Sequence, residues 1–134
     1  MILITHNTTN TVILTLKEKC TLANPYYLFV FTNDLTRDEV KFNCTDTSLY
    51  KDRYNKFSII ETQSQVNHDI GKVKLHPTGY WSYSIYEQTS PTNKSVAQTT
   101  SLVETGKVKV IGISATLDKY DNSPKNYVAY GIGT

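Results

Sequence analysis

The clearest pattern in this chain is the alternation of hydrophobic and polar residues in two of its segments. In residues 79–87, Trp81, Tyr83 and Ile85 fall on one face of an extended strand, and serines and tyrosines fall on the other. In residues 102–110, valines alternate with lysines in the same way. Each segment has one face suited to a dry core and one suited to solvent, so the two are predicted to be neighbouring strands of a β-sandwich.

The same period of two residues recurs along the chain. Residues 26–33 are apolar on both faces, which is typical of a strand covered on both sides, and we expect them at the centre of the core. They should pair with residues 39–44 in an antiparallel hairpin. Further strands are predicted over residues 10–17, 56–62, 72–76, 103–115 and 126–130. About seven to eight strands at this spacing indicate an all-β fold, an antiparallel β-sandwich. The strand over 103–115 should bend near Gly106 or Gly112.

The length of 134 residues is that of one domain with one core. We therefore predict a single β-sandwich domain over residues 1–134, with candidate terminal arms at 1–9 and 118–134. The arms have little to bury and are expected to reach neighbouring molecules. They supply four candidate interface residues: Ile2, Leu3, Ile4 and Ile132.

Charge and composition remove several classes of partner. The formal net charge is +2, and the basic residues are scattered among acidic ones with no basic run, so nucleic acid is not expected as a partner. No apolar run is long enough to span a membrane, and residues 1–7 lack the features of a secretory signal. We expect a chain that is made and folded in a cytoplasm, with Cys20 and Cys44 as two reduced thiols.

A search for catalytic chemistry in the sequence assigns no residue. Neither cysteine lies in an activating context, and the three histidines are scattered without metal-ligand spacing. Asp118, Asp121 and Asn122 match no known calcium loop and are ordinary turn residues. The prediction is a protein that is not an enzyme, with no catalytic, cofactor-binding or metal-binding residues.

Aromatic residues in the first segment offer a candidate contact surface. Trp81 and Tyr83 share the face of the core, whereas Tyr80 and Tyr86 lie among serines on the other face. Flat aromatic rings stack on sugar faces and on bases, and they also pack well in protein contacts. Tyr80 and Tyr86 are therefore predicted to lie in an interface or a sugar-binding surface.

Two groups of motifs carry a resemblance to a known group of proteins. Residues 79–87 (GYWSYSIYE), a polar loop and residues 102–110 (LVETGKVKV) resemble the last strand pair of small immunoglobulin-like modules in tailed-bacteriophage virions. Residues 10–16 (NTVILTL) and 24–33 (NPYYLFVFTN) resemble short structural proteins in phages of Bacteroidetes, including crAss-like phages. The resemblance covers most of the chain and implies an immunoglobulin-like sandwich in a virion. It carries over no catalytic or ligand-binding residue.

This resemblance leads to an expected function. The protein is expected to be a non-enzymatic structural protein of a bacteriophage virion, of the capsid auxiliary or decoration type, synthesised in the host cytoplasm. Its expected partners are the major capsid protein or other virion proteins, with further copies of itself as candidates. The alternatives are a connector in the tail or baseplate and a carbohydrate or receptor-binding module, the latter motivated by Tyr80 and Tyr86.

Overall fold

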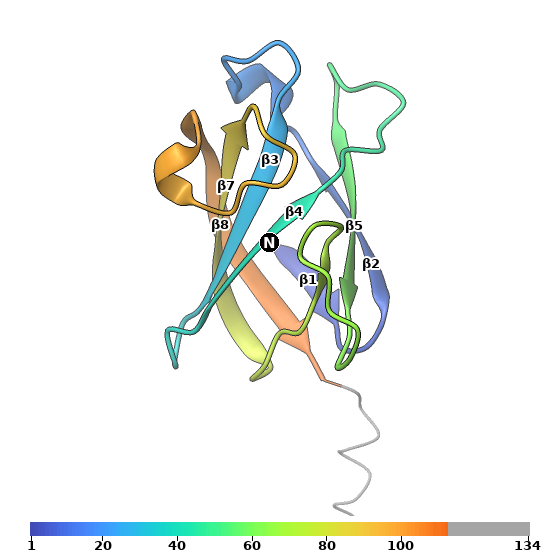
Figure 1. The fold of residues 1–134 in the computed structure, drawn as a ribbon. Helices are drawn as coiled ribbons and strands as arrows, with labels where there is room; N and C mark the ends of the chain where they lie inside the picture. Colours follow the sequence, from blue (N-terminus) through green and yellow to red (C-terminus); the bar gives the residue numbers. More distant parts are fainter. Residues whose placement is uncertain (113–134) are drawn as a thin grey trace, which may run out of the picture.

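The computed structural model describes residues 1–112 and shows two β-sheets packed face to face (Figure 1). Two short 3-10 turns, Lys17–Lys19 and Val96–Gln98, are the only helical elements in that range. The strands are β1 (Ile2–Thr5), β2 (Thr9–Leu14), β3 (Tyr26–Asn33), β4 (Glu39–Cys44), β5 (Asn55–Glu61), β6 (Lys72–Val73), β7 (Gly79–Gln88) and β8 (Ser101–Ile111). The predicted strand over 126–130, the C-terminal arm and Ile132 lie outside the described residues.

The strand order is that of an immunoglobulin-like sandwich. One sheet has five strands in the order β1-β8-β7-β3-β4, and the other has three in the order β2-β5-β6. The all-β sandwich is confirmed, and so are the β3–β4 hairpin and the adjacency of β7 and β8. Two pairs, β1–β8 and β5–β6, are parallel, so the expectation of a purely antiparallel sandwich is wrong for them.

Aromatic side chains from both sheets meet in the core. Phe29 of β3 stacks on Phe42 of β4, with ring centroids 5.2 Å apart, and meets Phe57 of β5 edge to face at 4.9 Å. The other face of β3 is also covered, because Leu28 and Val30 are 0% and 6% exposed. The apolar character of residues 26–33 on both faces is explained by this double burial. In the sheet itself β3 is the second strand from the edge.

Residues 2–5 form a core strand, and the prediction of an N-terminal arm there is wrong. They pair in parallel with β8, where Ile2 lies beside Val108 and Ile4 beside Val110. Ile2 is 5% exposed and Ile4 is 0% exposed, so both side chains belong to the core of the domain. The sequence gives these residues a strand period of two, and only Leu3 between them points outward, with 58% of its surface exposed.

The irregularity in β8 lies at Val103 and not at either glycine. Ile85 of β7 pairs with Glu104, but the next residue, Tyr86, pairs with Leu102. Val103 is therefore the extra residue of a β-bulge, and it is buried in the core. The bulge turns Glu104 toward the inner side of the sheet and Leu102 toward the outer side. Among residues 1–112, no helix has the length and apolar character needed to cross a membrane.

Candidate binding surface on the five-stranded sheet

Exposed apolar and basic side chains gather on the outer face of the five-stranded sheet. In the register of the sheet, Leu3 of β1, Lys109 of β8 and Tyr80 of β7 lie side by side. Tyr80 is 53% exposed, and its ring centroid lies 5.6 Å from the Lys109 ammonium group, within the range of a cation–π contact. Strand alternation produces this row, because Val108 and Val110 on either side of Lys109 point into the core.

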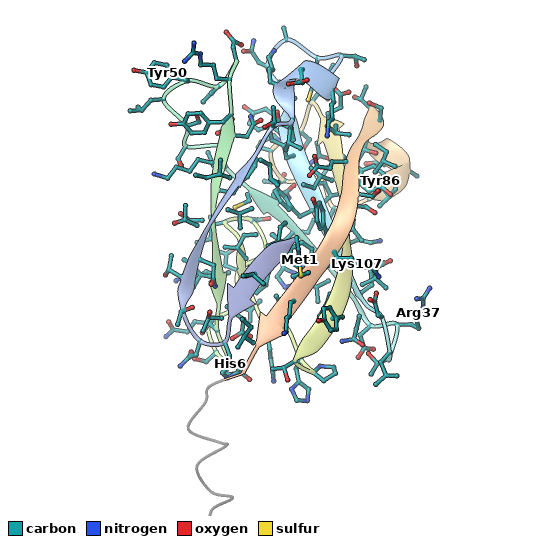
Figure 2. The ribbon with its side chains drawn as sticks, turned by 180° about the vertical axis from the view of Figure 1, so that it is seen from behind. Met1, His6, Arg37, Tyr50, Tyr86 and Lys107 are labelled. Carbon is teal, nitrogen blue, oxygen red and sulfur yellow. The ribbon has the colours of Figure 1, made fainter. Side chains whose placement is uncertain are left out.

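A groove of about 630 Å³ adjoins this row. Leu35, in the turn between β3 and β4, is one of its walls and is 87% exposed, and Met1 is another and is 75% exposed. Figure 2 shows Met1 and Lys107 close together on this face. Arg37, in the β3–β4 turn that also carries Leu35, lies beyond them. We define the sheet-face patch by six residues: Met1, Leu3, Leu35, Tyr80, Lys107 and Lys109.

A polar network holds the β3–β4 turn against the sheet beside the groove. Lys107 donates to Asp34 Oδ2 at 2.8 Å, and the Ser82 hydroxyl donates to Asp34 Oδ1 at 2.7 Å. These two hydrogen bonds lower the pKa of Asp34 below its ordinary value, and the bond from Lys107 has the larger effect. The carboxylate is therefore ionised at neutral pH and fixes the position of the turn that carries Leu35.

The turn itself is shaped by Asn33 at the end of β3. The Asn33 side-chain oxygen accepts hydrogen bonds from the backbone N–H groups of Leu35 and Thr36, both at 2.8 Å. This is the local pairing that asparagine favours in turns. The backbone donors of the turn are thereby satisfied, and the Leu35 side chain is left pointing to solvent at the rim of the groove.

Of the predicted interface residues, Leu3 and Tyr80 come together in the sheet-face patch. Tyr86 points to the same side of the sheet but is only half exposed, and it lies six residues from Tyr80, about 20 Å along an extended strand. Ile2 and Ile4 are in the core. The sequence analysis missed the contribution of Leu35, although a leucine inside an otherwise polar turn is a signal that could have indicated it.

Two buried carboxylates outside the patch hold loops in place. Glu61 is 1% exposed and accepts hydrogen bonds from the backbone N–H groups of Asn7 at 2.6 Å and Leu75 at 3.0 Å. Glu87, 0% exposed, accepts from the N–H groups of Thr21 and Leu22. Across residues 1–112, no cluster of three or more His, Cys, Asp and Glu side chains could hold a metal ion. What the sheet-face patch itself offers is an aromatic ring, apolar surface and ammonium groups, which are the components of a binding surface.

Comparisons with known proteins give one distant structural likeness. No protein-family model and no curated protein matches the sequence. A solved structure that resembles this one is that of a Bacteroides vulgatus protein proposed to be a glycoside hydrolase, with 8% identity and a TM-score of 0.45. The match covers 84% of this chain and 17% of that protein. A likeness this weak says nothing about the activity of this chain.

Proposed function

We propose that this protein is a non-enzymatic structural protein of a bacteriophage virion, of the capsid auxiliary type, which attaches to another virion protein through the sheet-face patch. The observation that carries the proposal is the presence of exposed Leu35 and Tyr80 at one groove, with exposed Leu3 beside Lys109 in the adjoining row of the sheet. Exposed apolar patches rimmed by polar groups are a mark of protein contact surfaces. The resemblance of the strand motifs to virion modules supplies the setting.

Several features of the patch suit a protein partner. Tyrosine is enriched among the residues that dominate interface energies, because a rigid ring buries much surface at a low cost in conformational entropy. Tyr80 stands on a regular strand in the middle of a sheet, so its position is fixed before binding. Lys109 beside it offers a cation to an acidic group on the partner. The expected partner, the major capsid protein or another virion protein, would then be held by an apolar contact with a polar rim.

The direct test is mass spectrometry of purified virions of the phage that encodes this chain, with the copy number measured against the major capsid protein. Copy number follows the symmetry of the assembly. Hundreds of copies, on the order of the capsid lattice, are expected for a capsid auxiliary protein, and about a dozen would place the protein in the tail or baseplate instead. Absence of the protein from the virion would overturn the proposal.

A carbohydrate-binding module is the second candidate, and the exposed ring of Tyr80 beside the groove is the observation that favours it. The distance of about 20 Å along the strand separates Tyr80 from Tyr86, so the two tyrosines cannot stack on one sugar ring together. Binding to a glycan array that is lost in Tyr80→Ser would favour this candidate. An array without signal, alongside binding to virion proteins, would reject it.

A further inference from the structure

One side of the sandwich is open. β1 is an edge strand of the five-stranded sheet, and β2 is an edge strand of the three-stranded sheet on the same side (Figure 1). A short turn joins them at one end, where the Thr5 N–H donates to Asn10 Oδ1 at 2.9 Å. Beyond that turn, no hydrogen bond in the described part of the chain links residues 2–4 to residues 11–14. Two strand edges therefore remain unpaired along this side.

The gap between these edges is a cleft of about 330 Å³ that is lined by both apolar and polar surface. Ile13 is 61% exposed and Leu3 is 58% exposed, although both belong to strands with a buried face. None of the side chains along the cleft is charged. They are Met1, Ile2, Leu3, Thr11, Val12, Ile13, Leu14 and Tyr83.

The opposite side of the sandwich is closed, so the opening is not a general property of the two sheets. There, the Asn43 N–H of β4 donates to the His68 carbonyl at 2.7 Å, in the segment that leads to β6. The Thr47 N–H donates to the Lys56 carbonyl at 2.8 Å and joins the chain after β4 to β5. Natural sandwiches cover or blunt their edges, and here only the β1 and β2 side lacks such a cover within residues 1–112.

We propose that residues 126–132 of a second copy of this chain fill the cleft by adding to the β1 edge as a strand. Twenty-two residues, 113–134, follow the described part of the chain. Residues 126–134 (NYVAYGIGT) contain no charged side chain, which matches a cleft that is lined by no charged side chain. In an extended strand Val128, Tyr130 and Ile132 share one face, and that face enters the cleft while the main chain pairs with β1.

The course of β8 favours a second copy over the chain's own segment. β8 ends at Ile111, whose carbonyl accepts from the His6 N–H at 2.8 Å, in the turn that closes one end of the cleft. The chain's own segment starts at this closed end and would have to pass the turn, whereas a neighbour's segment can enter at the other end, near Met1 and Leu14. Residues 113–125 can extend up to about 45 Å, which is enough to bridge adjacent copies.

Sedimentation velocity of the full chain over a range of concentrations tests the proposal. We expect self-association that weakens at least about tenfold in Ile13→Asp and in Val128→Asp, because a charge would then be buried in a contact that has no charged side chain to pair with it. Ile70→Asp is the matched control, since Ile70 is 52% exposed and lies in the segment between β5 and β6, away from the cleft. Its association should equal that of the parent protein.

A second measurement uses residues 1–112, the range that holds the eight strands the structure describes. A fluorescently labelled peptide of residues 126–134 should bind this shortened protein and fail to bind its Ile13→Asp variant. Absence of peptide binding, or equal association of the parent and Ile13→Asp, would overturn the proposal. A full chain that stays monomeric at every concentration would also overturn it, even if the peptide binds, since the segment would then fill its own cleft. Tyr80 does not line the cleft, so Tyr80→Ser should leave self-association unchanged. This variant therefore separates the test of the cleft from the test of the sheet-face patch.

Discussion

Tyr83 lies across Gly106, its cross-strand partner on β8, so closely that the strand has no room for a side chain at that position. A Cβ atom built on Gly106 would be 2.6 Å from Tyr83 Cε1 and 2.8 Å from its hydroxyl oxygen. The ring is held there because its hydroxyl donates to Glu104 Oε2 at 2.6 Å. Glu104 also accepts from Lys19 at 2.7 Å, so the tyrosine links two strands and the turn after β2.

Substitution Gly106→Ala should therefore destabilise the fold. The tyrosine ring must shift away from the new methyl group, which strains its packing and its hydrogen bond to Glu104, at a cost of about 1 to 3 kcal/mol. Urea unfolding followed by tryptophan fluorescence of Trp81 would measure the change. Gly112→Ala is the control, because its Cβ would meet only Thr78, at 3.7 Å, and should change stability by less than about 0.5 kcal/mol. Equal effects of the two variants would contradict the role given to Gly106.

Glu87 is a buried carboxylate that holds the chain before β3 to the start of β8. It accepts from the backbone N–H groups of Thr21 at 3.0 Å and Leu22 at 2.9 Å, and from the Ser101 hydroxyl. Burial raises the pKa of Glu87, but the hydrogen bonds from Ser101, Thr21 and Leu22 outweigh it and leave the pKa below its ordinary value. The carboxylate is thus the preferred form in the folded protein.

The lowered pKa of Glu87 sets a pH dependence for stability. A group whose pKa is lower in the folded state stabilises the protein above its unfolded pKa, near 4.3, and this contribution is lost as the pH falls through the folded pKa. We expect Glu87→Gln to lower the free energy of unfolding by about 2 to 4 kcal/mol at pH 7, because an amide N–H₂ would face backbone donors. The loss should be smaller at pH 3. Urea unfolding at both pH values measures this difference. The exposed Glu18→Gln is the control and should show no such change between the two pH values. A cost of Glu87→Gln that is the same at both pH values would contradict this assignment.

The sequence predicted the strands better than it predicted their edges. Strand alternation placed Trp81, Tyr83 and Ile85 in the core and Tyr80 outside, because side-chain period depends on local backbone geometry alone. The placement of Ile2 and Ile4 could not be obtained in this way. A strand of four residues carries a weak pattern, and its burial depends on a parallel partner about a hundred residues away in β8.

The groove could not be predicted from the sequence either, for a related reason. Leu35 and Tyr80 are 45 positions apart, and they meet only because the β3–β4 turn folds over the end of β7, where the Asp34 N–H donates to the Tyr80 carbonyl at 3.1 Å. A turn with a leucine can be recognised in a sequence. Which strand it faces is decided by the order of strands in the sheet, which no periodicity encodes.

The two cysteines should differ in their reactivity. Cys44 is 6% exposed, burial raises its pKa to about 11, and Gly71 packs so closely that a Cβ there would be 3.0 Å from Cys44 Sγ. Burial also raises the pKa of Cys20, which is half-buried and in contact with the Tyr27 hydroxyl at 3.6 Å. With a disulfide reagent at pH 8, we expect Cys20 to react slowly in the folded protein and Cys44 to react only when the protein unfolds. The Cys20→Ser variant isolates Cys44, and fast labelling of that variant under native conditions would show that the site is not sealed.

The proposed function predicts that Tyr80 dominates attachment of the protein to a virion partner. A tyrosine on a rigid strand, buried at the centre of a contact, typically contributes more than about 2 kcal/mol, so Tyr80→Ser should weaken binding to particles that lack this protein by at least about tenfold. Co-sedimentation with such particles measures the change, and thermal unfolding of the free variant shows whether its fold is intact. Tyr50→Ser is the matched control, because Tyr50 is 62% exposed but lies in the loop between β4 and β5, at the far end of the domain from the groove (Figure 2). Both tyrosines are exposed, so neither substitution should disturb the core. If Tyr50→Ser weakened binding and Tyr80→Ser did not, the attachment surface would lie at the loop between β4 and β5 instead.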